Sequence, residues 1–152
     1  MTSRIKSTVF MKKTVLAFGS FDLLHPGHLD YLSKARKLGD TLVVIVGRDD
    51  SIRRFKGRDP LFKEKDRVSM VGSLRMVERA VLGNRISDKN GIYRILKRLR
   101  PDVIALGYDQ RVDMAELKRR LRRYGLRSRI VRIKAGRRFA SYKSSRLRKL
   151  LE

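Results

Sequence analysis

Apolar residues are spaced along this chain in two alternating ways, one typical of buried strands and the other of helices. Short segments rich in apolar residues predict strands over residues 14–18, 41–46, 79–82, 103–106 and 129–133. The run at 41–46, six β-formers in a row, fits a central position in a parallel sheet covered on both faces. Between these segments, apolar residues recur every three or four positions. This period predicts helices over residues 27–38, from 64 onward, from 92 to before Pro101, 114–124 and 144–151.

The alternation of strand and helix determines the expected fold class. It predicts an α/β fold, namely a Rossmann-like, doubly wound, five-stranded parallel sheet with helices on both faces. Residues 47–60 are polar, and we expect them to form a connecting segment. In the last helix we expect Leu147, Leu150 and Leu151 to face inward. Such a sheet places its ligand at the carboxyl ends of the strands.

The chain length and the absence of certain segments limit the class of protein. A chain of 152 residues is one domain by length. Residues 1–8 are polar and basic without a period, so we expect a loose N-terminal arm over residues 1–11 and a single domain over residues 12–152. There is no cysteine, which excludes disulfides, thiolate metal sites and cysteine nucleophiles. Without a run of about 18 apolar residues, we expect a cytoplasmic protein with no membrane partner.

The formal net charge of +24 is unusually high for a chain of this size. Residues 111–152 alone hold 16 Lys or Arg against three acidic residues. A basic surface attracts polyanions, of which nucleic acid is one. A solvated surface and positive walls for a phosphorylated substrate would also account for this charge, and we favour these two over a nucleic-acid partner.

The two histidines of the chain lie three positions apart, between the first predicted strand and the first predicted helix. At a helix start, free backbone N–H groups and the helix dipole favour phosphate. Pro26 fixes the chain near the helix entrance, and Gly27 lets a ligand approach the backbone. We therefore predict that His25 and His28 are catalytic donors to a phosphate. The nucleotide site is expected to include Ser20, Phe21, Asp22, His25, Pro26, Gly27 and His28.

Other unusual residues follow the later strands, at the same expected edge of the sheet. Lys56 and Arg58 follow the second strand, Asp109 follows the fourth, and Ser144 and Ser145 precede the last helix. Cations and helix starts on one edge describe a triphosphate clamp, in which Lys56 is assigned a catalytic role. Asp109 could accept a hydrogen bond from a ribose or a base.

These motifs resemble those of the cytidylyltransferase-like nucleotidyltransferases. Gly19-Ser20-Phe21-Asp22 and His25-Pro26-Gly27-His28 resemble the Gly-Thr-Phe-Asp and His-x-Gly-His signatures of that family. Lys56-Gly57-Arg58, Arg67, Gly107-Tyr108-Asp109-Gln110 and Ser144-Ser145-Arg146-Leu147-Arg148 resemble its later motifs in order and spacing, so the resemblance covers residues 12–150. The chain departs from the family at Ser20, which stands for Thr, and at Tyr142-Lys143-Ser144-Ser145, which stands for Ile-Ser-Ser-Thr.

The resemblance is greatest to the archaeal-type FAD synthase branch, although that branch commonly carries cysteines near its C-terminus. It implies a single nucleotidyltransferase domain over residues 12–152 that transfers AMP from ATP to FMN, giving FAD and pyrophosphate. It also implies Mg²⁺ held through the phosphates, with no protein metal ligands, and a possible homodimer. Two alternatives stay open from the sequence: a cytidylyltransferase acting on glycerol 3-phosphate or a similar alcohol phosphate, and a basic nucleic-acid-binding module with a vestigial nucleotide site.

Overall fold

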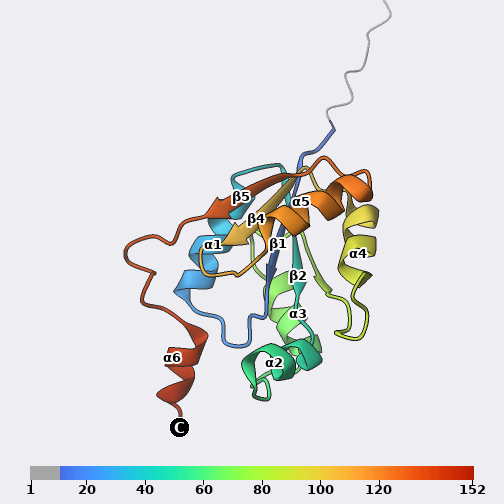
Figure 1. Ribbon diagram of the computed structural model, residues 1–152. Coiled ribbons are helices and arrows are strands. Elements are labelled where there is room, and N and C mark those ends of the chain that lie inside the picture. Colours follow the sequence, from blue (N-terminus) through green and yellow to red (C-terminus); the bar gives the residue numbers. More distant parts are fainter. Residues whose placement is uncertain (1–10) are drawn as a thin grey trace, which may run out of the picture.

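The computed structural model describes residues 11–152 and is built on one five-stranded sheet (Figure 1). All neighbouring strands are parallel, in the order β3-β2-β1-β4-β5. The strands are β1 (Thr14–Gly19), β2 (Thr41–Val46), β3 (Arg79–Leu82), β4 (Val103–Gly107) and β5 (Arg129–Ile133). The predicted arm over residues 1–11 lies, except for Met11, outside the described residues.

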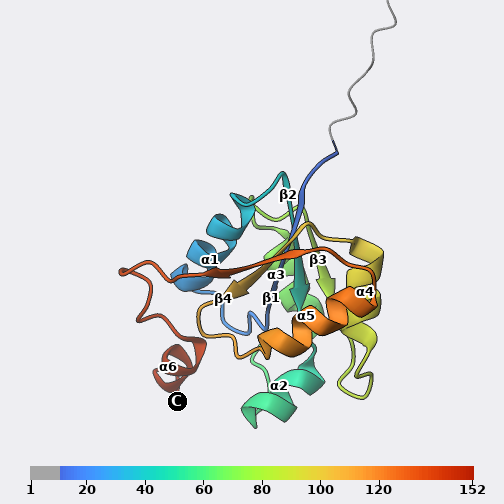
Figure 2. The ribbon, with the colours of Figure 1, turned by 45° about the horizontal axis from the view of Figure 1, so that its top comes forward.

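Helices cover both faces of the sheet, which confirms the predicted fold class. Leu32 and Ala35 of α1 and Val71 of α3 pack against one face, whereas Leu96 of α4 and Leu121 of α5 pack against the other. Figure 2 shows α4 and α5 on the side of the sheet away from α1. The helices are α1 (Pro26–Arg36), α2 (Asp49–Lys56), α3 (Glu64–Gly72), α4 (Gly91–Leu99), α5 (Met114–Arg123) and α6 (Ser144–Lys149).

The segment after β2 differs from the prediction, because residues 47–60 contain the helix α2. Ile52 is the only residue of α2 that is buried, so the segment lacks the apolar period by which helices are predicted. Asp49 and Asp50 occupy the first turn, three basic residues occupy the last, and Gly57 ends the helix with a left-handed φ of 63°. These charges complement the helix dipole, and this arrangement is the feature of the sequence that could have indicated the helix α2.

The C-terminal helix is present as predicted, but its leucines do not face inward as a set. Leu150 and Leu151 are 79% and 71% exposed, and no residue of α6 is buried. Figure 1 shows α6 apart from the sheet, beyond its carboxyl edge, which agrees with the exposure of these leucines. Of the three leucines, only Leu147 is half-buried.

The order of the strands determines where a site can form. The chain places β2 and β3 on one side of β1, and β4 and β5 on the other. The connections after β1 and β4 therefore diverge at the carboxyl edge, which is where a doubly wound sheet opens a crevice. Among the described residues, no helix is both long enough and apolar enough to cross a membrane.

Candidate active site

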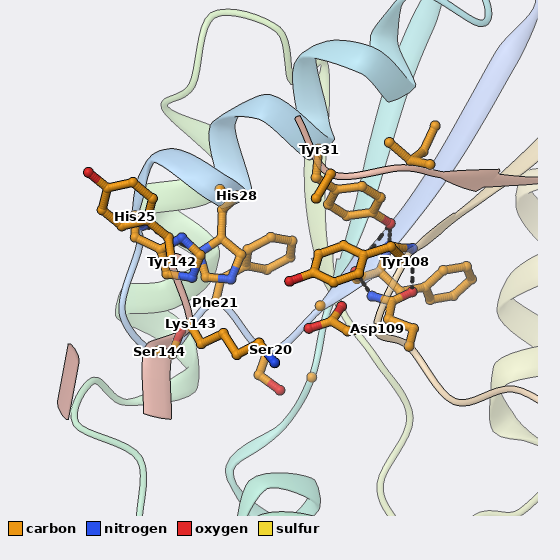
Figure 3. Close-up of a pocket in the computed structure, with 18 of the residues that line it drawn as sticks. Ser20, Phe21, His25, His28, Tyr31, Tyr108, Asp109, Tyr142, Lys143 and Ser144 are labelled. Atoms are coloured by element: carbon orange, nitrogen blue, oxygen red, sulfur yellow. Dashed lines mark hydrogen bonds between the residues drawn. The ribbon is translucent and has the colours of Figure 1, made fainter. Parts of the chain in front are cut away.

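A cavity of about 710 Å³ opens at the carboxyl edge of the sheet (Figure 3). A volume of this size is typical of small-molecule sites. The structure brings together around it ten of the residues that the sequence singled out: Ser20, Phe21, His25, Gly27, His28, Lys56, Arg58, Asp109, Ser144 and Ser145. Asp22 and Pro26 do not line it. Pro26 is the exposed first residue of α1.

The connection between β1 and α1 is held in an unusual path by Phe21. This residue has a left-handed φ of 50°, and its ring is almost completely buried in the core. A Cβ atom on Gly19 would come within 2.6 Å of that ring. The tight packing of Phe21 over Gly19 fixes where the chain enters α1, and so fixes the position of the two histidines.

The two imidazoles stack on each other at the head of α1. Their ring centroids are 3.8 Å apart with an interplanar angle of 22°. The backbone N–H of His25 donates to Nδ1 of His28 over 3.3 Å. Because Nδ1 of His28 accepts a hydrogen bond, the proton of the neutral ring sits on Nε2. His28 therefore offers one N–H donor from Nε2.

Both histidines are held in the neutral form. The pKa of His28 is lowered to about 3, first by burial and then by the nearby His25 and Lys56. Burial also lowers the pKa of His25, and the carboxylate of Asp109 opposes this shift. Nδ1 of His25 is buried without a hydrogen-bond partner among residues 11–152. A buried polar atom of this kind is costly unless a ligand or water satisfies it.

Gly27 is required by the position of His25. A Cβ atom at residue 27 would lie 2.9 Å from Cε1 of His25, which is closer than such atoms approach in proteins. Any side chain there would displace the imidazole. The glycine between the histidines thus keeps the first ring in place as well as leaving room for a ligand.

Lys56 and Arg58 bring positive charge to the cavity from the end of α2. Lys56 is exposed as a whole residue, yet partial burial of its ammonium, and then the charge of Arg58, lower its pKa. Arg58 donates to the carboxylate of Asp22 over 2.9 Å. Across the cavity, the hydroxyl of Ser144 donates to the carbonyl of Leu23 over 3.2 Å.

Asp22 was predicted in the nucleotide site but lies outside the lining of the cavity. It is 1% exposed and accepts hydrogen bonds from the backbone N–H groups of Leu61 and Phe62. It also pairs with Arg58 and, over 3.4 Å, with Arg148 of α6. Asp22 joins the β1–α1 connection, the segment after α2 and the C-terminal helix. Asp22 therefore has a structural role, because it holds walls of the cavity together.

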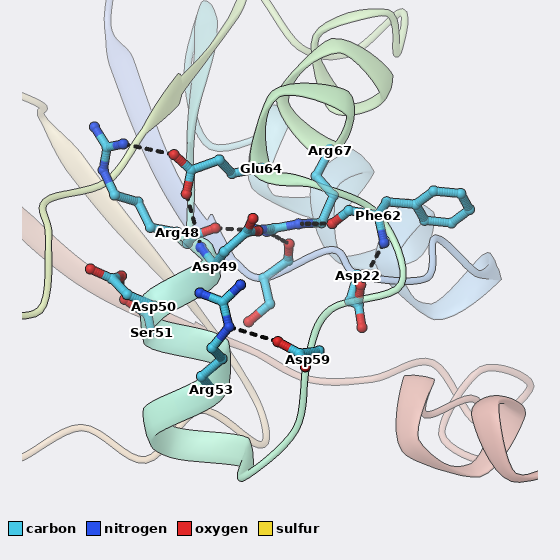
Figure 4. Close-up of polar contacts among 12 residues, drawn as sticks. Asp22, Arg48, Asp49, Asp50, Ser51, Arg53, Asp59, Phe62, Glu64 and Arg67 are labelled. Carbon is cyan, nitrogen blue, oxygen red and sulfur yellow. Dashed lines mark hydrogen bonds and ion pairs between the residues drawn. The ribbon is translucent and has the colours of Figure 1, made fainter.

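Arg67 makes polar contacts with four other residues (Figure 4). It is fully buried, and its guanidinium donates to the carbonyls of Ser20, Gly47 and Phe62. It also pairs with Asp49 over 2.7 Å. Arg67 thereby holds the ends of β1 and β2 together beneath the cavity. Its neighbour Arg48 pairs with Glu64 and does not line the cavity.

The opposite wall is built by the connection after β4. Gln110 donates to the carbonyl of Phe18 over 2.6 Å and accepts from the N–H of Gly107, so this connection is tied to β1. The hydroxyl of Tyr108 lies 3.5 Å from the carbonyl of Ala140. Asp109 is exposed toward the cavity from this wall. In Figure 3, Tyr108 and Asp109 face the wall that carries the histidines.

Several further residues line the cavity without having been assigned to the site from the sequence, among them Tyr31, Tyr142 and Lys143. Tyr142 lies alongside His25, with ring centroids 6.1 Å apart, and Lys143 follows it. Tyr31 donates its hydroxyl to the carbonyl of Ala105 over 2.8 Å, and burial raises its pKa. The signal for Tyr31 was available, because it lies three residues after His28 on the same face of α1. Tyr142 was visible only as a departure from the family motif, whereas Lys143 begins the segment Lys143-Ser144-Ser145, which also offers donors at a helix start.

The side chains around the cavity suit phosphate better than a bare metal ion. Within residues 11–152, no group of three or more His, Cys, Asp or Glu side chains is arranged to hold a metal. The cavity instead combines neutral imidazole donors, ammonium and guanidinium groups, and hydroxyls. Donors of these kinds bind and orient a phosphate chain.

The comparisons with known proteins agree with this geometry. The cytidylyltransferase-like family model matches residues 16–150, and the chain belongs to that family. Curated relatives include the FAD synthase of Archaeoglobus profundus, which is 46% identical over 80% of this chain and 74% of its own length. The FAD synthase of Methanothrix thermoacetophila is 50% identical over 78% of this chain and 79% of its own length. The predicted resemblance is thus confirmed.

Two solved structures with different levels of sequence identity support the fold. The crystal structure of the lipopolysaccharide core biosynthesis protein from Thermoplasma volcanium has a TM-score of 0.75 and 40% sequence identity, and the match covers 83% of this chain and 99% of that one. Pantoate-β-alanine ligase from Francisella tularensis matches with a TM-score of 0.54 and 15% identity, over 86% of this chain and 62% of that one. The second likeness shows the shared fold alone.

Proposed function

We propose that this chain is a cytoplasmic FAD synthase, an FMN adenylyltransferase that transfers AMP from ATP to FMN. The observation that carries the proposal is the pair of neutral, stacked imidazoles at the head of α1, inside a cavity lined by cations. The FAD synthases at 42–50% identity supply the identity of the acceptor.

The reaction is an in-line displacement at the α-phosphorus of ATP. A phosphate oxygen of FMN forms the new bond to this phosphorus, the bond to the bridging oxygen of the β-phosphate breaks, and pyrophosphate leaves with the electron pair. The attacking phosphate is already anionic at neutral pH, so no general base is needed. Catalysis reduces to placement and charge stabilisation.

The histidines act as donors to the reacting phosphate. The Nε2–H group of His28 donates to an oxygen of the α-phosphate, where negative charge is redistributed in the transition state. His25 donates beside it, toward the bridging oxygen. A preorganised donor of this kind contributes roughly 2.7–4 kcal/mol to transition-state stabilisation. The dipole of α1 adds about 0.3–1 kcal/mol and is the smaller effect.

The pyrophosphate end of ATP is held by groups from distant parts of the chain. Lys56 and Arg58 approach from α2, and the hydroxyls of Ser144 and Ser145 approach from α6. Asp109, on the wall opposite the histidines, accepts a hydrogen bond from the ribose or the base. Mg²⁺ bound together with ATP would be held through the phosphates of the substrate, and it would supply charge neutralisation for the leaving pyrophosphate.

A substrate matrix tests the proposal. ATP, CTP, GTP and UTP are each combined with FMN, glycerol 3-phosphate and phosphopantetheine in the presence of Mg²⁺, and pyrophosphate release is measured together with the nucleotide product by chromatography. We expect turnover with ATP and FMN, giving FAD. Turnover only with CTP and glycerol 3-phosphate would overturn the proposal. The expected homodimer is tested separately by sedimentation velocity.

A further inference from the structure

Much of the positive charge that the active site does not use lies on the outer sides of α4 and α5. These helices bury Leu96 and Leu121 against the sheet and turn their basic residues to solvent. We call this surface the basic face. Its exposed members are Arg94, Lys97, Arg98, Arg100, Lys118, Arg119, Arg122, Arg123, Arg127 and Arg129.

The basic face spans α4 and α5, which meet where the C-terminal end of α5 lies beside α4 (Figure 2). The rings of Tyr93 and Tyr124 stack with centroids 5.4 Å apart and an interplanar angle of 11°. The guanidinium of Arg120 lies 5.2 Å from the centre of the Tyr93 ring, and it also donates to Asn90 over 2.8 Å. These contacts join the N-terminal part of α4 to the C-terminal end of α5.

Most of these charges have no acidic partner. Arg94 pairs with Asp88 and Arg119 pairs with Glu116. The other eight members form no ion pair with any residue in the described range 11–152. The helix dipole accounts for cations in the last turn, but its effect ends there. It leaves Arg94, Lys118 and the loop arginines unexplained.

We propose that the basic face binds the phosphate backbone of a nucleic-acid duplex. Eight of its ten members are arginine, and the guanidinium group matches the phosphate group with two parallel hydrogen bonds. Its aromatic residues, Tyr93 and Tyr124, are half-buried and stack on each other, so they are poorly placed to stack on unpaired bases. Both features fit a duplex bound through its phosphates, independently of sequence.

The proposed surface is separate from the cavity. The strands β4 and β5 begin directly after α4 and α5, so the C-terminal ends of both helices lie at the amino edge of the sheet. The cavity opens at the carboxyl edge. A duplex on the basic face therefore leaves the nucleotide site open, and the two activities can coexist in one chain. The inference does not depend on which acceptor the enzyme uses.

The test uses the full chain and a fluorescently labelled RNA duplex of about 20 base pairs, with binding followed by anisotropy. If about four phosphates are contacted, affinity falls about 10²-fold between 50 and 200 mM salt. The test variant changes Lys97, Arg98, Arg122 and Arg123 to Gln. The control variant changes Lys37, Lys65, Arg75 and Arg79 to Gln, because these exposed cations lie on or beside α1, α3 and β3, away from α4 and α5.

We expect the test variant to lose at least about 30-fold in affinity and to show a shallower salt dependence, while the control variant changes less than about threefold. FAD formation by both variants should equal that of the parent, which shows that each is folded. Equal losses in the two variants would overturn the proposal, because they would show diffuse attraction. So would the absence of binding at 100 mM salt.

Discussion

His28 shows how the surroundings of one residue decide its chemistry. Its Nδ1 atom accepts a backbone hydrogen bond and its pKa is lowered to about 3, chiefly by burial, so it carries a single proton on Nε2 throughout the physiological range. A ring held in this way is a donor in a fixed direction. It is a poor general base, which agrees with an acceptor phosphate that needs none.

The lowered pKa makes stability depend on pH. In the unfolded chain His28 titrates near 6.5, whereas in the folded chain it titrates near 3. Between these values the unfolded state binds the additional proton, so the free energy of unfolding decreases as the pH falls. We expect His28→Gln to lessen this decrease by at most about 1.4 kcal/mol per pH unit. Urea unfolding at pH 7 and pH 4.5 measures it; parallel losses in parent and variant would contradict the assignment.

Lys56 is expected to act on binding with little effect on folding. Because it lines the cavity and makes no ion pair in the described chain, Lys56→Ala should weaken ATP binding by roughly 10- to 100-fold, the usual value of a charged hydrogen bond. The control is Arg54→Ala, which removes an exposed cation of the same helix that does not line the cavity. Equal ATP affinities of the two variants in calorimetric titration would count against the clamp.

Among the elements, the strands and five of the six helices were predicted, and α2 was not. The predicted bounds of β2, β3 and β5 agree with the structure, and β2 is apolar after Thr41 because it is covered on both faces. The helix α2 buries one residue and so leaves no apolar period in the sequence, whereas α6 was predicted over residues 144–151 but buries none of its residues. Contacts to other segments, rather than local pattern, hold these two helices in place.

The same distinction applies to the site. Ten predicted residues meet at one cavity because parallel strands bring their carboxyl ends to one edge. The direction of Asp22 could not be predicted, because it depends on the left-handed turn at Phe21 and on residues 36 to 126 positions away. No local pattern records such contacts. The buried place of Arg67 was hidden for the same reason.

The tie made by Asp22 gives a test at the scale of elements. Asp22→Asn removes the charge that holds Arg58 and Arg148 and should cost about 1–3 kcal/mol in the free energy of unfolding. The control is Asp59→Asn, which removes an exposed, solvent-screened pair with Arg53 and should cost much less than Asp22→Asn. Urea unfolding compares them, and similar costs for the two variants would show that Asp22 does not hold the walls together.

For the whole molecule, the net charge of +24 sets the response to salt. Like charges repel more in the compact state, and salt screens this repulsion. We expect the melting temperature to rise by several degrees between 10 and 300 mM NaCl, since each 1 kcal/mol corresponds to about 2–4 °C for a chain of this length. Scanning calorimetry measures the shift. The variant with four neutralised members of the basic face should show a smaller rise; an equal or larger one would show that charge repulsion is not the cause.

The positions of the basic face and of the active site bear on an alternative that the sequence left open. The sequence left a nucleic-acid-binding module open as an alternative to an enzyme. The structure separates the two surfaces, with the cavity at the carboxyl edge of the sheet and the basic face on α4 and α5. A catalytic chain with a second surface that binds polyanions accounts for both the cavity and the basic face.

The central claim is that the imidazole pair stabilises the α-phosphate during transfer of AMP to FMN. Its most direct test is the single-turnover rate of FAD formation from ATP and FMN by the parent and by His28→Ala, with equal melting curves as the sign of an intact fold. The loss of one preorganised donor should slow the variant about 10²- to 10³-fold. FAD formation within a few-fold of the parent would contradict the account.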